Sequence, residues 1–279
     1  MAEDLKTEYK GKLLAVKDLP TLPKVLEEVT RLVEDPDAST DKIAKVISLD
    51  QVLTAKVLKM VNSPIYGFPG RIGSIHNALV LLGFNVIRGV IISTSVFDIM
   101  TKSMVGLWEH SVGCALACTE IAKAAGLKDP EEYSVAGLLH DLGKVVAAVQ
   151  MPQVKIDIEA LVKSQDLTYF QAEKKVLGFG HDRINAWLAG HWHLPVRLTE
   201  GISHHHTPTR AEHYPASACV VHIADFLVRL MEYGSGGDDN VPPLDPNALK
   251  ILKLQLKDLE GVLDQLCDKF LEVADLSFA

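Results

Sequence analysis

The chain contains 279 residues, which is enough for one large domain or two smaller ones with a substantial core. Hydrophobic residues make up 48% of it and charged residues 23%, an ordinary balance for a globular protein. The formal net charge of −8 argues against a protein that binds duplex DNA, because phosphate contacts depend on clustered Lys and Arg.

The first hundred residues have the apolar spacing of helices, and no segment alternates as a strand would. A stripe of apolar residues covers 25–33, a capped segment follows at 39–48, and apolar residues recur at every fourth position over 49–61. The most hydrophobic segment, 75–100, is interrupted by polar residues such as Asp98, so it never reaches about 18 uninterrupted apolar residues. We therefore expect a buried core helix there rather than a membrane span.

The rest of the chain continues with helical spacing. We expect further helices at 107–125, 130–151, 159–163, 169–177, 181–191, 196–204, 215–233 and 249–274. The prediction is an all-α protein in which an N-terminal helical bundle (residues 1–100) packs on a second helical domain (residues 101–279).

The cysteines and the N-terminal residues indicate where in the cell the protein is located. The first residues lack the apolar run of a signal peptide, and the four cysteines form no CxxC pair. We expect a cytoplasmic protein that has no disulfide framework and does not enter a membrane. Cys114 and Cys118, one helical turn apart, are interpreted as small buried residues.

The order of the histidines and acidic residues is the most informative feature of the sequence. His110, the pair His140–Asp141, His181, the triplet 204–206 and Asp225 follow one another on separate predicted helices. A metal site in the core of a helical bundle needs this arrangement, since each helix contributes one or two inward ligands. Neutral imidazoles and carboxylates suit iron, manganese, zinc or nickel, and the set does not choose among them. We predict one or two divalent transition-metal ions.

Each of these residues has a plainer interpretation when it is taken alone. A single His110 or Asp225 is more often a hydrogen-bonded helix residue than a ligand. A histidine triplet in a loop is more often exposed surface. The combined order of the residues nevertheless favours the metal interpretation.

These motifs resemble a known superfamily. The segment "LLHDLGK", preceded by "WEHS" and followed by "GFGHDRINAWLAGHWHLP", "ISHHHTP" and "HIADFL", resembles the HD superfamily of metal-dependent phosphohydrolases. From Leu19 to Pro208 the chain is similar to HDOD domains, the HD-related output domains of bacterial signalling proteins. The resemblance implies an HD-type helical domain behind the N-terminal bundle.

The resemblance also implies roles for individual residues. The ligands of the HD metal site correspond here to His110, His140, Asp141 and Asp225, with Asp141 able to bridge two ions. The further ligands of binuclear relatives, such as the HD-GYP phosphodiesterases, correspond to His181, His205 and His206. The register of the triplet stays open, because the pair could also be His204 and His205. Lys144 corresponds to the lysine of the "HDxGK" motif, where an ammonium could hold a phosphate oxygen.

One departure from the relatives concerns catalysis. HD-GYP enzymes continue after the histidine pair with a glutamate and a Gly-Tyr-Pro loop, whereas this chain has Thr207 and no such loop. Two functions are therefore weighed. In a regulatory signalling module the metal would fix the helices. In a metal-dependent phosphohydrolase for nucleotides or cyclic dinucleotides, Asp141 and Lys144 would be catalytic, with Arg183 and Arg210 as candidates for substrate recognition.

The same considerations predict the partners. We expect a signalling protein partner and a phosphate-containing small molecule, but neither a nucleic acid duplex nor a membrane. The final helix could also support a homo-oligomer. A helix-turn-helix at 41–61 would fit the length of that DNA-binding motif, but its apolar face points inward and the chain is acidic, so we disfavour it.

Overall fold

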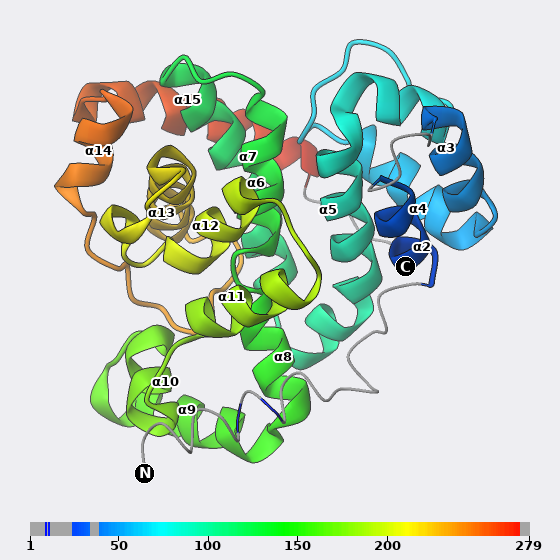
Figure 1. The fold of residues 1–279 in the computed structure, drawn as a ribbon. Helices are drawn as coiled ribbons and strands as arrows, with labels where there is room; N and C mark the ends of the chain where they lie inside the picture. The colour runs from blue at the N-terminus through cyan, green and yellow to red at the C-terminus, as the bar shows by residue number, and fades with distance from the viewer. Residues whose placement is uncertain (1–8, 10, 12–23, 34–38, 274–279) are drawn as a thin grey trace.

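Every element in the described part of the computed structural model is helical, and no strand occurs there (Figure 1). The structure describes residues 9, 11, 24–33 and 39–273. The helices of its first part are α2 (Lys24–Val33), α3 (Thr40–Ser48), α4 (Gln51–Val61) and α5 (Ile75–Ser103). The predicted all-α class is confirmed.

The second part of the chain holds the remaining helices. They are α6 (Leu107–Ala124), α7 (Pro130–Leu139), α8 (Leu142–Gln150), α9 (Pro152–Gln165), α10 (Tyr169–Leu177), α11 (His181–His191), α12 (Val196–His204), a short 3-10 turn (Pro208–Arg210), α13 (Pro215–Leu230), α14 (Pro246–Leu252) and α15 (Leu256–Val273). Helix α6 packs against α7, α13 and α15, and α12 contacts α7, α11 and α13. These helices form the scaffold on which the predicted ligands lie.

Helix α5 connects the two parts of the molecule. It contacts α2, α3 and α4 on one side and α6, α7 and α8 on the other (Figure 1). Its length and mean hydropathy of 1.9 would suit a membrane span, but 67% of that apolar window is buried inside the protein. The helix kinks at Gly83, where φ is 74°, a conformation that glycine adopts without a steric penalty. It is the predicted core helix, whereas the predicted boundary near residue 100 stays a prediction.

The sequence pattern missed several helix ends. The helix expected over 130–151 is interrupted, since α7 ends at Leu139 and α8 begins at Leu142. Apolar spacing does not reveal this break, because both halves are buried and His140 still has helical φ and ψ. Helix α9 is longer than expected. The last helix is divided into α14 and α15 at Lys253, whose φ is 56°, and its expected end at 274 lies outside the described residues.

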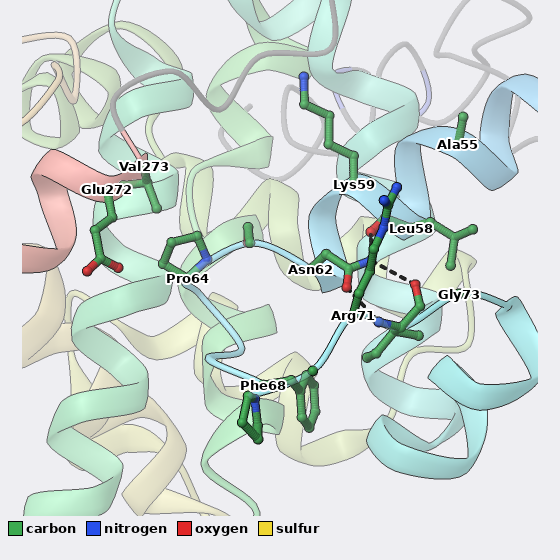
Figure 2. Close-up of a pocket in the computed structure, with 14 residues that line it drawn as sticks. Ala55, Leu58, Lys59, Asn62, Pro64, Phe68, Arg71, Gly73, Glu272 and Val273 are labelled. Atoms are coloured by element: carbon green, nitrogen blue, oxygen red, sulfur yellow. Dashed lines mark hydrogen bonds between the residues drawn. The ribbon is translucent and has the colours of Figure 1, made fainter.

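A groove of about 990 Å³ lies where the N-terminal bundle meets the end of α15 (Figure 2). One wall is the loop that follows α4. The Asn62 side chain fixes the conformation of this loop by two hydrogen bonds to the backbone of Ile72. Its Nδ2 donates to the Ile72 carbonyl at 2.9 Å, and its Oδ1 accepts from the Ile72 N–H at 2.7 Å. The other wall includes Glu272 and Val273. None of the predicted metal ligands lines this groove.

Candidate metal centre

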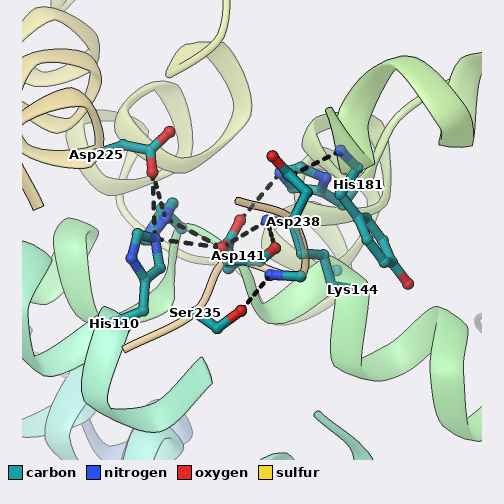
Figure 3. A network of polar contacts seen from close by, with 12 residues as sticks. His110, Asp141, Lys144, His181, Asp225, Ser235 and Asp238 are labelled. Atoms are coloured by element: carbon teal, nitrogen blue, oxygen red, sulfur yellow. Dashed lines mark hydrogen bonds and ion pairs between the residues drawn. The ribbon is translucent and has the colours of Figure 1, made fainter. Parts of the chain in front are cut away.

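The seven predicted ligands come from five separate places in the fold and converge in its core. Helix α6 contributes His110, the break between α7 and α8 contributes His140 and Asp141, and the first residue of α11 is His181. His205 and His206 follow the end of α12, and Asp225 lies on α13. Figure 3 shows Asp141 in the middle, with His110 and Asp225 on one side and His181 on the other. Side chains up to 115 residues apart in sequence therefore face one another.

The first group of donors surrounds the Nε2 atom of His110. This atom lies 3.2 Å from Oδ1 of Asp225 and 3.6 Å from Oδ2 of Asp141. Nε2 of His140 lies 3.3 Å from the same Asp141 oxygen and 4.0 Å from Oδ1 of Asp225. All four side chains are at most 5% exposed. Two imidazoles and two carboxylates thus share one enclosed space.

The second group surrounds the Nε2 atom of His181. Oδ1 of Asp141 lies 3.1 Å away, and the Nε2 atoms of His205 and His206 lie 3.2 and 3.0 Å away. Asp141 therefore directs one carboxylate oxygen toward each group. His204 belongs to neither group and instead lines a separate surface pocket, so the geometry places the pair 205–206, not 204–205, beside His181.

The polar atoms of the centre do not all find hydrogen-bond partners among themselves. Nε2 of His140 is buried without a hydrogen-bond partner in the described part of the chain. The Nε2 atoms of His205 and His206 both lie within 3.2 Å of Nε2 of His181, although a ring nitrogen has only one proton or one lone pair to offer. Buried polar atoms without partners destabilise a fold by about 1–3 kcal/mol each. A cation between them would satisfy these atoms, so the residues present fit a metal ion.

Burial and neighbouring charges set the protonation of the centre. Burial, reinforced by the neighbouring histidines, holds the pKa of both His205 and His206 well below the usual value. Burial would raise the pKa of Asp141, but the charges of His140 and Lys144 hold it well below the usual range. Neutral imidazoles beside an ionised carboxylate are the forms that bind metals.

Two residues that sequence reasoning missed orient the predicted ligands. Oε2 of Glu173 on α10 lies 2.6 Å from Nδ1 of His181 and accepts the His181 backbone N–H at 2.9 Å. Burial would lower the pKa of His181, but the charge of Glu173 and hydrogen bonds to it and to Asp141 raise it to about 9. A carboxylate on the outer nitrogen of a metal-binding histidine is a common arrangement that fixes the ring.

The second missed residue, Asn185 on α11, is fully buried at the break between α7 and α8. Its Nδ2 donates to the carbonyls of His140 and Ile202, and its Oδ1 accepts the Gly143 N–H at 2.8 Å. The side chain thereby satisfies backbone groups that the helix break leaves free and holds His140 and Asp141 in place. No local sequence signal could identify it, because its partners are 17 to 45 residues away.

The chain is similar to proteins of one known domain family. The HDOD domain model matches residues 19–208. The chain belongs to the HDOD domain family. It is 27% identical over 223 residues to an uncharacterized protein of Treponema pallidum (strain Nichols); these residues are 78% of this chain and 43% of that protein, so the chain spans less than half of that relative.

Two solved structures are similar over nearly the whole HDOD chain. An HDOD domain protein of unknown function from Geobacter sulfurreducens is 27% identical, with 99% of this chain and 98% of that one covered and a TM-score of 0.76. A protein of Shewanella amazonensis SB2B, provisionally described as a phosphohydrolase, is 26% identical, with 94% and 96% covered and a TM-score of 0.68. The fold described above is thus the fold of the family.

Two cations already contact the carboxylates of this HDOD centre. Nζ of Lys144 lies 2.7 Å from Oδ2 of Asp141, and Nε of Arg229 lies 2.9 Å from Oδ1 of Asp225. Arg229, one helical turn after Asp225 on α13, is a further residue that the sequence analysis did not select. Burial would raise the pKa of Asp225, but Arg229 and His110 hold it well below its usual range.

The loop at residues 233–240 covers this side of the centre. The Gly236 carbonyl accepts a hydrogen bond from Nζ of Lys144 at 2.8 Å. Oδ1 of Asp238 lies 3.1 Å from a guanidinium nitrogen of Arg229, while its Oδ2 accepts the Tyr169 N–H at 2.8 Å. A pocket of about 350 Å³ lies under the loop and is lined by loop residues together with His110 and Arg229, so the loop and Arg229 form the wall between this pocket and the first group of donors.

Proposed function

We propose that this HDOD chain is a cytoplasmic regulatory module of signal transduction whose His/Asp centre holds two divalent transition-metal ions. The observation that carries this proposal is that the two cations best placed for a phosphate are already bonded inside the centre. Lys144 contacts Asp141 and the Gly236 carbonyl, and Arg229 contacts Asp225 and Asp238. Cations held in this way stabilise the carboxylates and are not free to bind a phosphate that enters the pocket lined by His110, Arg229 and the 233–240 loop.

Each ion has its own donors in this proposal. His110, His140 and Asp225 would hold the first ion, His181 and the pair 205–206 would hold the second, and Asp141 would contribute one oxygen to each. Bound ions supply positive charge that neutralises the carboxylates, and they link helices from distant parts of the chain. Their binding free energy therefore contributes to folding. Zinc, iron, manganese and nickel all accept such donors.

We also propose that the partner of the module is another signalling protein. Leu49, in the turn between α3 and α4, and Val52, in the first turn of α4, are 74% and 68% exposed. A docked partner would remove this apolar surface from water. The N-terminal bundle would thus provide the contact surface, and the metal centre would maintain the scaffold behind it.

Metal analysis of the purified protein tests the first part of the proposal. We expect about two transition-metal ions per chain, and a melting temperature that falls when a chelator removes them. His140→Ala should lower both the metal content and the melting temperature. His191→Ala is the matched control, because His191 is an exposed histidine at the end of α11 and should change neither. Absence of metal, together with an unchanged melting temperature in His140→Ala, would contradict the proposal.

A metal-dependent phosphohydrolase is the second candidate, and one surface pocket favours it. A pocket of about 420 Å³ is lined by Lys174, Arg183, Arg210 and His204, beside the second group of donors. No ion pair joins these three cations to a carboxylate in the described part of the chain. Lys174 lies 4.0 Å from the centroid of the Phe170 ring, which stacks on His206. The Shewanella amazonensis relative, provisionally described as a phosphohydrolase, is consistent with this alternative.

A substrate panel separates the two candidates. The metal-loaded protein is assayed on cyclic dinucleotides, nucleotides and a chromogenic phosphodiester. Turnover that disappears in Asp141→Asn and weakens in Arg183→Ala would establish the enzyme, with Asp141 and Lys144 in the catalytic centre. Retained metal without turnover on any of these substrates supports the regulatory module.

A further inference from the structure

We propose that the sulfur of Cys114 is an additional ligand of the first ion, so that this position is a mixed thiolate, imidazole and carboxylate site. The inference rests on the proposed metal centre and adds a sulfur ligand to it. From the sequence alone, Cys114 is interpreted as a small buried residue. It concerns the group formed by His110, His140 and Asp225.

The position of Cys114 places its sulfur among these donors. The residue lies on α6 one turn after His110, is fully buried, and has its Sγ 3.6 Å from Nε2 of His110. Donor atoms of His110, Cys114, His140 and Asp225 all lie within 4.8 Å of one another. A nitrogen and a sulfur that occupy neighbouring positions on one ion, at about 2.0 and 2.3 Å from it, are separated by roughly 3.0–3.7 Å for angles of about 90–120°. The observed separation from His110 is that of two ligands of one ion.

A hydrogen bond from the Cys114 thiol to His110 explains fewer of the contacts in this group than a shared metal ion does. Nε2 of His110 also faces Oδ1 of Asp225 at 3.2 Å and has only one proton or one lone pair. If this nitrogen is protonated it donates to Asp225, and the thiol finds no acceptor there. If it is unprotonated, it accepts from the thiol but directs a lone pair at the carboxylate. An ion among these atoms satisfies all of them.

A second, independent observation points into the same space. Nε2 of His140 is fully buried and has no hydrogen-bond partner among the described residues. Nδ1 of the same ring lies 2.7 Å from the Gly137 carbonyl, so the ring is fixed with Nε2 directed at the group. The unpaired nitrogen, the sulfur and the carboxylate therefore face one another.

Ligation by Cys114 has defined chemical consequences. The S–H bond is replaced by a metal–sulfur bond, and one proton is released to solvent for each ion bound. Thiolate ligation favours zinc, iron(II) or cobalt(II) over manganese(II). The sulfur also takes a coordination position that a catalytic ion keeps open for water, which suits a closed, structural site.

Cobalt substitution tests the ligand directly. The full chain is stripped with a chelator, loaded with Co²⁺ and examined by near-ultraviolet absorption, with bound cobalt counted separately. The wild type should show a sulfur-to-cobalt charge-transfer band, and Cys114→Ser should lose it. Cys118→Ser is the matched control, because Cys118 is equally buried one turn further along α6 and belongs to none of the donor groups in the described chain, so its band should persist.

The outcomes distinguish this inference from the proposed function. Cobalt bound by the wild type without the band, or with a band that persists in Cys114→Ser, overturns the sulfur ligand and leaves the metal centre standing. Failure of the wild type to bind any cobalt overturns both. X-ray absorption of the zinc-loaded wild type needs no variant; a sulfur neighbour at about 2.3 Å supports the proposal, and a shell of nitrogen and oxygen alone rejects it.

Discussion

Nζ of Lys144 donates a 2.7 Å hydrogen bond to Oδ2 of Asp141, and both side chains are at most 1% exposed. A buried ammonium and a buried carboxylate depend on each other, since each alone would be an uncompensated charge in a medium of low dielectric constant. Lys144 therefore has a structural role whether or not the centre is catalytic.

Substitution of Lys144 by methionine should destabilise the metal-free protein strongly. Loss of one partner from a buried ion pair typically costs about 3–5 kcal/mol. Bound metal should recover part of this loss, because the ion supplies positive charge to Asp141 in place of the ammonium. Urea denaturation with and without a chelator measures both effects. Lys155→Met removes the partially exposed pair with Glu159 and should cost at most about 1 kcal/mol; an equal loss in the two variants would refute the argument.

Close packing between α8 and α11 leads to a second prediction. A Cβ added to Gly143 would lie 2.4 Å from the His181 carbonyl oxygen and 3.0 Å from Oδ1 of Asn185. Because the first obstacle is backbone, α11 must move, and Gly143→Ala should cost about 1–3 kcal/mol. The displacement should also weaken metal binding, since it moves His181. Thermal denaturation and metal content measure the two effects.

Gly190 provides the control for this substitution. It lies on α11, and an added Cβ there would meet nothing within 4 Å. Gly190→Ala should therefore be neutral or stabilising by about 0.5–1 kcal/mol, because alanine is the better helix former. Destabilisation of both variants to the same extent would contradict the argument, because helix propensity favours alanine at both positions and only Gly143 contacts His181.

Because the 233–240 loop lies over the metal centre, we predict that it slows the exchange of bound metal. The buried Asp238 carboxylate holds this loop to Arg229 and to the Tyr169 backbone N–H. Asp238→Asn removes its charge and weakens both contacts, so metal release to a chelator should be faster and hydrogen exchange at 234–240 should increase. Asp239→Asn, at the exposed neighbouring position, should leave both rates unchanged. Equal release rates in wild type and Asp238→Asn would show that the loop does not control access.

The helices could largely be predicted from the sequence because their signals are local. Apolar spacing identified α4, α6, α11 and α13, and the HD-type motifs selected side chains that the fold does bring together. The break at His140 and Asp141 was missed because Asn185, a residue on another helix, satisfies its backbone groups. A pattern of apolar residues contains no information about such a distant hydrogen bond.

The supporting residues of the centre escaped prediction for the same physical reason. Glu173 belongs to a different helix from His181, and Asp238 lies in an irregular loop, so no helical spacing connects either of them to the site. Arg229 was detectable in principle, because it follows Asp225 by four residues and therefore shares its helix face. Cys114 stands in the same relation to His110, but a buried cysteine on a core helix usually serves packing.

The carboxylate of Glu200 predicts a pH dependence that is separate from the metal centre. It accepts the backbone N–H groups of Glu212, His213 and Tyr214, with the first two at 3.0 Å. Burial would raise the pKa of Glu200, but these N–H groups stabilise the charged form and lower it below 4.5. The folded-state pKa thus lies below the unfolded one, so this contribution to stability is present above pH 4.5 and is lost as the pH falls through the folded-state value.

Glu200→Gln should therefore destabilise the protein at pH 7 by about 1–3 kcal/mol, the usual effect of weakening hydrogen bonds to a charged acceptor. The difference from wild type should shrink as the pH is lowered below 4.5, because the wild-type carboxyl then becomes neutral too. Denaturation of the metal-free protein over a pH series measures this difference. Glu260→Gln, at an exposed position on α15, should match wild type throughout. A gap between wild type and Glu200→Gln that stays constant down to acidic pH would contradict the argument, because the loss would then come from the different shape of the amide and not from the missing charge.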